Sequence, residues 1–395
     1  MGEVVPLRAG VGPAGAAVDW ALERRQGWRE VQRLWWWLWS RCPGLGWVRL
    51  SRLWARYPDP AVAWAAPLVE LLAALEMPAR RGEALERFRA QWGPEPLAAA
   101  QRAMRQQGAL LLPGDPALPA AVMELERPPV ALHWRGRGSV WAPLRLRQAV
   151  AVVGTRRPSP HGLAMAEALG AALAQAGWPV VSGLAEGIDG AAHRGCLAKG
   201  GRPVAVLGTG LERVYPRHHA GLQWRVAAEG LLITEQPLGA AVQPGNFAAR
   251  NRLQVALARA LVVVECPEAS GALHSARIAW DQALPIWVVP ADAGKRSATG
   301  SNRLLSGMAS PLLDPVDLVR QLGPGPLMAP AAARCVSVPG AAHDPELLQA
   351  MGCGASLEQL CLALDQPLAA VSSRLLALEL AGAVRAQPGL CWQPT

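Results

Sequence analysis

Ala149-Val-Ala-Val-Val153 is the first of several short, valine-rich runs that decide the fold of this chain. Amphipathic, helix-like stretches separate it from similar runs at 179–181, 203–207, 231–233, 261–264 and 286–289. Short β-branched runs that alternate with helices are typical of a parallel sheet with helices on both faces. We therefore expect an α/β fold whose main part is a Rossmann-like domain over residues 148–321. In such sheets, ligands bind at the carboxyl ends of the strands.

One loop at that edge, Pro244-Gly-Asn-Phe-Ala-Ala-Arg-Asn-Arg252, concentrates groups that bind nucleotides. Pro and Gly open a turn, and Asn246 is expected to cap the helix that follows. Two guanidiniums, two amides and one ring suit a ligand with negative charge and flat faces. Arg250 and Arg252 would contact phosphates, and Phe247 would pack or stack on a base. The alternative is a capped helix with a solvated basic turn.

Other loops at the same edge also carry groups that bind phosphate. Gly154 permits a tight turn before Arg156, whose forked donors suit a phosphate. Gly208-Thr-Gly210 allows close backbone approach, but Arg213 occupies the last position of a dinucleotide fingerprint. Ser270 and the amide after it can hold a phosphate at a helix start. The chain also lacks a P-loop motif, so the set of loops predicts an extended anionic ligand rather than a mononucleotide.

Four polar residues near these loops have less certain roles. Asp189 and His193 are four apart and could pair on a helix. Acid–base chemistry would also need a nucleophile or a water site, so we interpret them as a helix-stabilising pair. Lys199 and Arg202 add positive charge, but they precede a strand, and whether they reach the same groove stays open.

Composition favours a polyanionic partner. The net charge is +9 and the isoelectric point is near 9.8. The positive excess lies in residues 1–144 and 145–320, whereas residues 321–395 are mildly acidic. The seven cysteines form no CxxC pair, which fits a reducing cytosol. No apolar run is long enough to span a membrane, so we expect a soluble cytoplasmic protein without a membrane contact.

The remaining segments predict smaller parts around the main domain. Pro43-Gly-Leu-Gly46 resembles the turn of a helix-hairpin-helix, which can hold a phosphate or simply connect helices. The tryptophans at 35–39 project all around a helix, which favours a core or a protein interface. The expected parts are a disordered start (1–18), a helical domain (19–107), a connector that extends a sheet edge or packs against the next domain (108–147), a linker (322–344) and a winged-helix-like domain (345–395).

The order of these motifs resembles the DNA-processing protein A family (DprA/Smf). The matching motifs are Val153-Gly-Thr-Arg156, Val181-Ser-Gly-Leu-Ala-Glu-Gly-Ile-Asp189, Gly200-Gly-Arg-Pro-Val-Ala-Val-Leu-Gly-Thr-Gly-Leu211, Thr234-Glu-Gln-Pro-Leu-Gly239, Pro244-Gly-Asn-Phe247 with Arg250-Asn-Arg252, and Ser270-Gly with Asn302-Arg-Leu-Leu305. The resemblance implies a homodimeric protein that coats single-stranded DNA and loads the RecA recombinase during natural transformation. It implies no catalytic residue, cofactor or metal.

The residues predicted to contact DNA follow from the motifs and the resemblance together. They are Gly154, Thr155, Arg156, Gly183, Lys199, Arg202, Gly208, Thr209, Gly210, Asn246, Phe247, Arg250, Asn251, Arg252, Ser270, Gly271 and Asn302. The chain departs from the family pattern at Leu253-Gln-Val-Ala-Leu-Ala258 and at Ala269-Ser-Gly-Ala272. The second departure loses a base and a hydroxyl, which suggests weaker backbone contact or a retuned groove.

Two other functions stay open. A Rossmann-like nucleotide phosphoribohydrolase would carry a Pro-Gly-Gly-x-Gly-Thr-x-x-Glu loop, and residues 265–274 lack its double glycine and the glutamate that follows. A scaffold that binds a recombinase without binding DNA is the other alternative.

Overall fold

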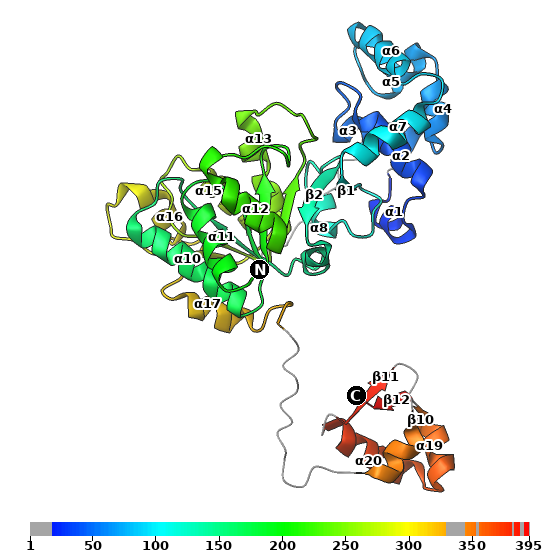
Figure 1. Ribbon diagram of the computed structural model, residues 1–395, viewed down its shortest axis with the longest axis vertical. Helices are drawn as coiled ribbons and strands as arrows, with labels where there is room; N and C mark the ends of the chain where they lie inside the picture. Colours follow the sequence, from blue (N-terminus) through cyan, green and yellow to red (C-terminus); the bar gives the residue numbers. More distant parts are fainter. Residues whose placement is uncertain (1–17, 329–343, 353–354, 381–382, 388–390, 395) are drawn as a thin grey trace, which may run out of the picture. The chain divides into compact units, whose positions relative to one another are not determined.

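The computed structural model describes residues 18–328, 344–352, 355–380, 383–387 and 391–394. The chain divides into two compact units, Met1–Leu327 and Met328–Thr395 (Figure 1). Nearly all of the expected disordered start (1–18) and most of the expected linker (322–344) lie outside the described residues.

A nine-stranded sheet forms the centre of the first unit. Its strand order is β1-β2-β6-β5-β4-β3-β7-β8-β9. The strands β3 to β9 run parallel to one another, which confirms the predicted α/β, Rossmann-like sheet. The six valine-rich runs are all strands. The bounds are β1 Ala109–Leu111, β2 Leu132–Gly136, β3 Val150–Val153, β4 Val180–Ser182, β5 Pro203–Leu207, β6 Leu231–Thr234, β7 Ala260–Val263, β8 Ile286–Val288 and β9 Ser310–Pro311.

Helices cover both faces of the sheet because its strands alternate between two apolar cores. In β3, Val150 and Val152 pack toward α10, α11 and α17, whereas Ala151 and Val153 pack toward α9, α14 and α15. The bounds are α8 Ala120–Met123, α9 Trp141–Arg145, α10 Pro160–Gln175, α11 Ile188–Ala198, α12 Ala220–Glu229, α13 Pro244–Ala249, α14 Asn251–Ala256, α15 Gly271–Asp281, α16 Thr299–Leu304 and α17 Pro315–Leu322, with short 3₁₀ turns η2 Gly138–Val140, η3 Arg217–His219 and η4 Arg296–Ala298.

The order of the strands indicates where a ligand would bind. The strand order reverses at β3, because β4 lies on one side of it and β7 on the other. The loops after these strands therefore diverge and leave a crevice at the carboxyl edge. At the far edge, β1 and β2 run antiparallel and join the sheet through β6, as expected for the connector.

Among the described residues, seven α-helices precede the sheet and pack around a cluster of tryptophans. Trp36 and Trp39 are completely buried, and Trp35 and Trp37 are nearly so, which confirms that this cluster is core rather than a base-stacking platform. The Trp36 indole donates to the Val130 carbonyl, and Arg33 pairs with Asp115. The bounds are α1 Trp20–Gln26, α2 Glu30–Ser40, α3 Trp47–Arg56, α4 Pro60–Ala65, α5 Leu68–Ala74, η1 Ala79–Arg81, α6 Gly82–Gln91 and α7 Pro96–Gln106.

The second unit consists of three helices and a small three-stranded sheet among its described residues, which agrees with the predicted winged-helix-like domain. Ser356 caps α19 through a capping box with Gln359, and the strands pair in the order β10-β12-β11. A small apolar core joins all these elements. The bounds are α18 Pro345–Met351, β10 Ala355–Ser356, α19 Leu357–Leu364, α20 Leu368–Leu380, β11 Val384–Gln387 and β12 Cys391–Pro394.

Among the described residues, no single helix has the length and apolar character needed to cross a membrane. The bent pair of α19 and Leu368–Glu379 meets that test, but only by length and composition.

Candidate nucleic-acid interface

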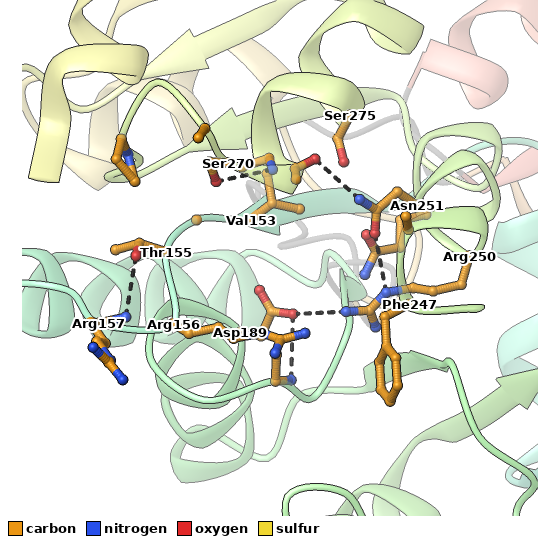
Figure 2. Close-up of a pocket in the computed structure, with 18 of the residues that line it drawn as sticks. Val153, Thr155, Arg156, Arg157, Asp189, Phe247, Arg250, Asn251, Ser270 and Ser275 are labelled. Atoms are coloured by element: carbon orange, nitrogen blue, oxygen red, sulfur yellow. Dashed lines mark hydrogen bonds and ion pairs between the residues drawn. The ribbon is translucent and has the colours of Figure 1, made fainter. Parts of the chain in front are cut away.

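A pocket of about 450 Å³ opens at the carboxyl edge of the sheet, where the strand order reverses (Figure 2). The loops after β3, β4 and β7 line it, together with α13 and the first turn of α14. A second pocket of about 560 Å³ adjoins the first and extends to the loop after β5. Arg156, Ala185 and Phe247 line both pockets. The two pockets therefore form one groove across the loops that the sequence singled out.

A cation and two rings lie where the pockets meet. The Arg156 guanidinium carbon is 5.8 Å from the centroid of the Phe247 ring, and the Tyr215 ring centroid is 4.9 Å from that same ring. Arg156 is exposed, and among the described residues no hydrogen bond or ion pair holds its guanidinium. A Cβ at Gly208 would lie 2.8 Å from the Phe247 ring, so glycine lets the ring sit against β5. This arrangement leaves one cation and one aromatic pair free for a ligand.

Arg250 does not have the role expected from the sequence. Its guanidinium is buried and donates to the Val206 carbonyl, to Asn251 Oδ1 at 3.1 Å and to Asp189 Oδ2 at 3.5 Å (Figure 2). A Cβ at Gly183 would overlap this guanidinium. The Arg250 guanidinium therefore makes its hydrogen bonds within the protein. We correct the expectation that it contacts phosphate: Arg250 instead holds the start of α11, β5 and α14 together at the base of the groove.

Asp189 and His193 do not form the predicted helical pair. The Asp189 carboxylate accepts from the Gly183 and Ala185 amides, at 3.1 and 3.4 Å, and from Arg250. Burial raises the pKa of Asp189, and the Arg250 charge opposes that rise. His193 is fully buried, and neither ring nitrogen has a hydrogen-bond partner in the described part of the chain. Burial, followed by the Arg250 charge, lowers the pKa of His193 to about 3, so it is neutral at pH 7.

The two ends of the Pro244–Arg252 segment also differ from expectation. Helix α13 has Gln243 as its N-cap and no side-chain cap, so Asn246 does not cap it, because Pro244 already starts the helix. Arg252 holds both Glu235 oxygens at 2.6 Å and donates to the Arg127 and Ala249 carbonyls. The Arg252 guanidinium is thus also bonded within the protein. We correct the expected phosphate contact: Arg252 instead links α14 to the loop after β6 through its ion pair with Glu235.

The floor of the first pocket is polar. Ser270 Oγ accepts from the Ala272 amide and caps α15, and Asn251 Nδ2 donates to the Gly271 carbonyl at 3.1 Å. Ser275 and Gln254 also line this pocket, and the buried Ser275 Oγ and Gln254 Nε2 have no hydrogen-bond partner among the residues that the structure describes.

The sequence reasoning missed Ser275 and Gln254, although helical spacing could have found them. Gln254 lies three residues after Asn251, and Ser275 lies four after Gly271, so each follows a predicted residue on the same helix face.

Several predicted residues do not line either pocket. Arg202 donates to the Glu229 carbonyl and, like Lys199, lies at the amino ends of the strands, away from the groove. Asn302 bonds both backbone groups of Ala291 and fixes a loop instead. Thr209 donates its hydroxyl to the Arg213 carbonyl. The predicted residues that line the pockets are Gly154, Thr155, Arg156, Gly183, Phe247, Arg250, Asn251, Ser270 and Gly271.

Comparison with known proteins gives the family. A family model described as DNA recombination-mediator protein A matches residues 109–323, and a model of the DprA winged helix domain matches residues 330–389. The chain belongs to the DprA/Smf family. The described residues contain no group of three or more His, Cys, Asp or Glu that could hold a metal ion.

Individual relatives match about two thirds to three quarters of this chain. Protein Smf of Synechocystis is 34% identical over 298 residues, which is 75% of this chain and 74% of that protein. DNA processing protein DprA of Bacillus subtilis is 28% identical over 265 residues and is covered over 87% of its length. The X-ray structure of DNA processing protein A from Streptococcus pneumoniae aligns with a TM-score of 0.57 and 26% identity, covering 65% of this chain and 87% of that one. This chain is thus a DprA-type DNA recombination mediator by family.

Proposed function

We propose that this protein binds single-stranded DNA in the groove at the carboxyl edge of its sheet, protects incoming DNA there and loads the RecA recombinase on it during natural transformation. The observation that carries the proposal is the placement of Arg156 beside Phe247 and Tyr215 between two adjoining pockets. A single strand presents phosphates to the cation and unstacked bases to the rings, whereas a duplex keeps its bases stacked inside.

The polar floor of the first pocket supports the same proposal. Buried polar groups in proteins nearly always have hydrogen-bond partners, so Ser275 and Gln254 point to a polar ligand or water above them. A hydroxyl and an amide can each bond the edge of a base or a sugar oxygen. A nucleotide unit of the bound strand would supply these bonds while its phosphate stays near Arg156.

Membership of the family supports the further parts of the proposal. In these further parts we propose that the protein loads the recombinase, acts in natural transformation, forms a homodimer through its sheet domain and is located in the cytoplasm. Recombinase loading would appear as faster RecA filament growth on single strands that this protein has already bound.

The test is a fluorescence-anisotropy titration of a labelled oligo-dT with the wild-type protein and two variants. Phe247→Leu should weaken binding about 5- to 150-fold, because a stacked base contributes about 1–3 kcal/mol. Arg156→Gln should weaken binding and reduce its salt dependence. Arg277→Gln, an exposed charge on α15 that lines neither pocket, is the control and should bind as the wild type does. Unchanged affinity in both groove variants would refute this site.

A further inference from the structure

A third cavity, of about 500 Å³, lies where the helical segment meets the edge of the sheet. The first turns of α3 line it with Trp47, Arg49 and Arg52, and the loop before β2 adds Arg127. Glu235, after β6, completes the wall. Three arginines thus line one cavity, and like charges repel unless something compensates them.

The acidic residues nearby leave much of this charge uncompensated. Glu235 gives both carboxylate oxygens to Arg252, and Glu76 pairs with Arg52. Within the described part of the chain, Arg49 is held by neutral carbonyls alone, those of Gly44 at 2.8 Å and Leu75 at 3.3 Å. These bonds fix its position without neutralising its charge.

Arg127 adds a second free charge. Its side chain is exposed, and its own carbonyl accepts a hydrogen bond from Arg252. Among the described residues, no acceptor holds its guanidinium. Two arginines that line the cavity, Arg49 and Arg127, therefore have no carboxylate partner among the described residues.

Three consecutive residues connect this cavity to the groove. Arg250 and Asn251 line the first pocket, whereas Arg252 bonds Glu235 and the Arg127 backbone on the cavity side. Arg250 and Arg252 are two residues apart, so their Cα atoms lie within about 7.6 Å of each other. The same segment therefore borders the first pocket and, through Arg252, contacts Glu235 and Arg127, which line the cavity.

We propose that this arginine cavity is a second binding site for the phosphodiester backbone of single-stranded DNA, and that a strand held in the groove continues into it. Arg49 and Arg127 contact phosphates, and the Trp47 side chain supplies an apolar wall beside them. The inference rests on the proposed function, because it concerns the path of the same strand. It also gives the helical segment a part in DNA binding that does not depend on its tryptophan core.

The experiment compares a short and a long oligo-dT, of about 6 and about 20 nucleotides, on the full-length protein at several salt concentrations. Arg49→Gln with Arg127→Gln should leave the affinity for the short oligonucleotide within twofold of wild type. For the long one, the log–log salt slope should become shallower by about 1.4, since each contacted phosphate contributes about 0.7. Arg102→Gln with Arg105→Gln removes the same charge from α7, outside every pocket described here, and should leave both slopes unchanged.

A second variant guards against a folding defect, because Arg49 also braces the turn before α3. Arg127→Glu reverses an exposed charge, leaves the Arg49 bonds intact and should weaken only the long oligonucleotide. If the variants changed the affinity for both oligonucleotides equally, or left the affinity for the long one unchanged, the proposal of a second binding site in the cavity would be wrong. Failure of the wild type to bind either length would instead overturn the proposed function, and the cavity with it.

Discussion

Arg156 and Arg250 carry the same guanidinium but meet different surroundings. Arg156 follows Gly154-Thr155 in the loop after β3, and its charge lies beside Phe247 in the groove. Arg250 lies at the junction of α13 and α14, and its side chain is buried against Asp189. The residue types predicted an anion site at this edge, and the geometry supports one. They could not predict which arginine faces solvent, because that depends on partners distant in sequence.

Replacement of Arg250 should therefore affect stability as well as binding. Arg250→Met leaves Asp189 buried without a counter-charge, which typically costs about 3–5 kcal/mol. Chemical denaturation in urea would show this as a lower midpoint. Arg250→Met with Asp189→Leu should recover part of the loss, because both charges are then gone. A midpoint equal to wild type in the single variant would show that the buried pair does not hold the groove together.

At the scale of elements, the strands were predictable and the ends of the helices at the site were not. The valine-rich runs became strands because β-branched side chains fill both faces of a covered sheet. The Pro244 start of α13 was also visible, since proline fits a first helical turn. The division between α13 and α14 was not, because Arg250 keeps helical backbone angles there and no proline or glycine marks the position.

Two buried histidines predict how these elements respond to acid. His133 lies in β2, which joins the sheet through β6, and burial followed by the Arg41 charge lowers its pKa to about 4. His193 lies in α11, and its pKa is about 3, for the same main cause, burial. In the unfolded chain both titrate near pH 6.5, so below that pH the unfolded state binds more protons. The folded state should therefore lose stability as pH falls from about 6.5 toward 4.

The expected loss is about 1.4 kcal/mol per pH unit for each histidine once the pH is well below 6.5. Urea midpoints measured from pH 7 to pH 5 would follow it. His193→Gln should remove about half of this slope. A flat profile across that range would contradict the buried, neutral state of both rings.

At the scale of the whole molecule, function depends on loops that only the fold brings together. Separate strands of one parallel sheet contribute Arg156, Tyr215, Phe247 and Ser270 to one edge, although they are far apart in the sequence. The positive charge that composition assigned to residues 1–320 lies partly in this groove and partly in the arginine cavity. Sequence patterns predicted the edge and the family. They missed the cavity because its walls come from α3, the loop before β2 and the end of β6.

The salt dependence of oligo-dT binding tests the central claim most directly. A strand whose phosphates contact several guanidiniums releases counter-ions on binding, so log K should fall linearly with log salt, with a slope of about −0.7 per contacted phosphate. We expect steep dependence for the wild type and a slope shallower by about 0.7 for Arg156→Gln. Binding that ignores salt, or no binding to single strands at low salt, would contradict a DNA groove at this edge of the sheet.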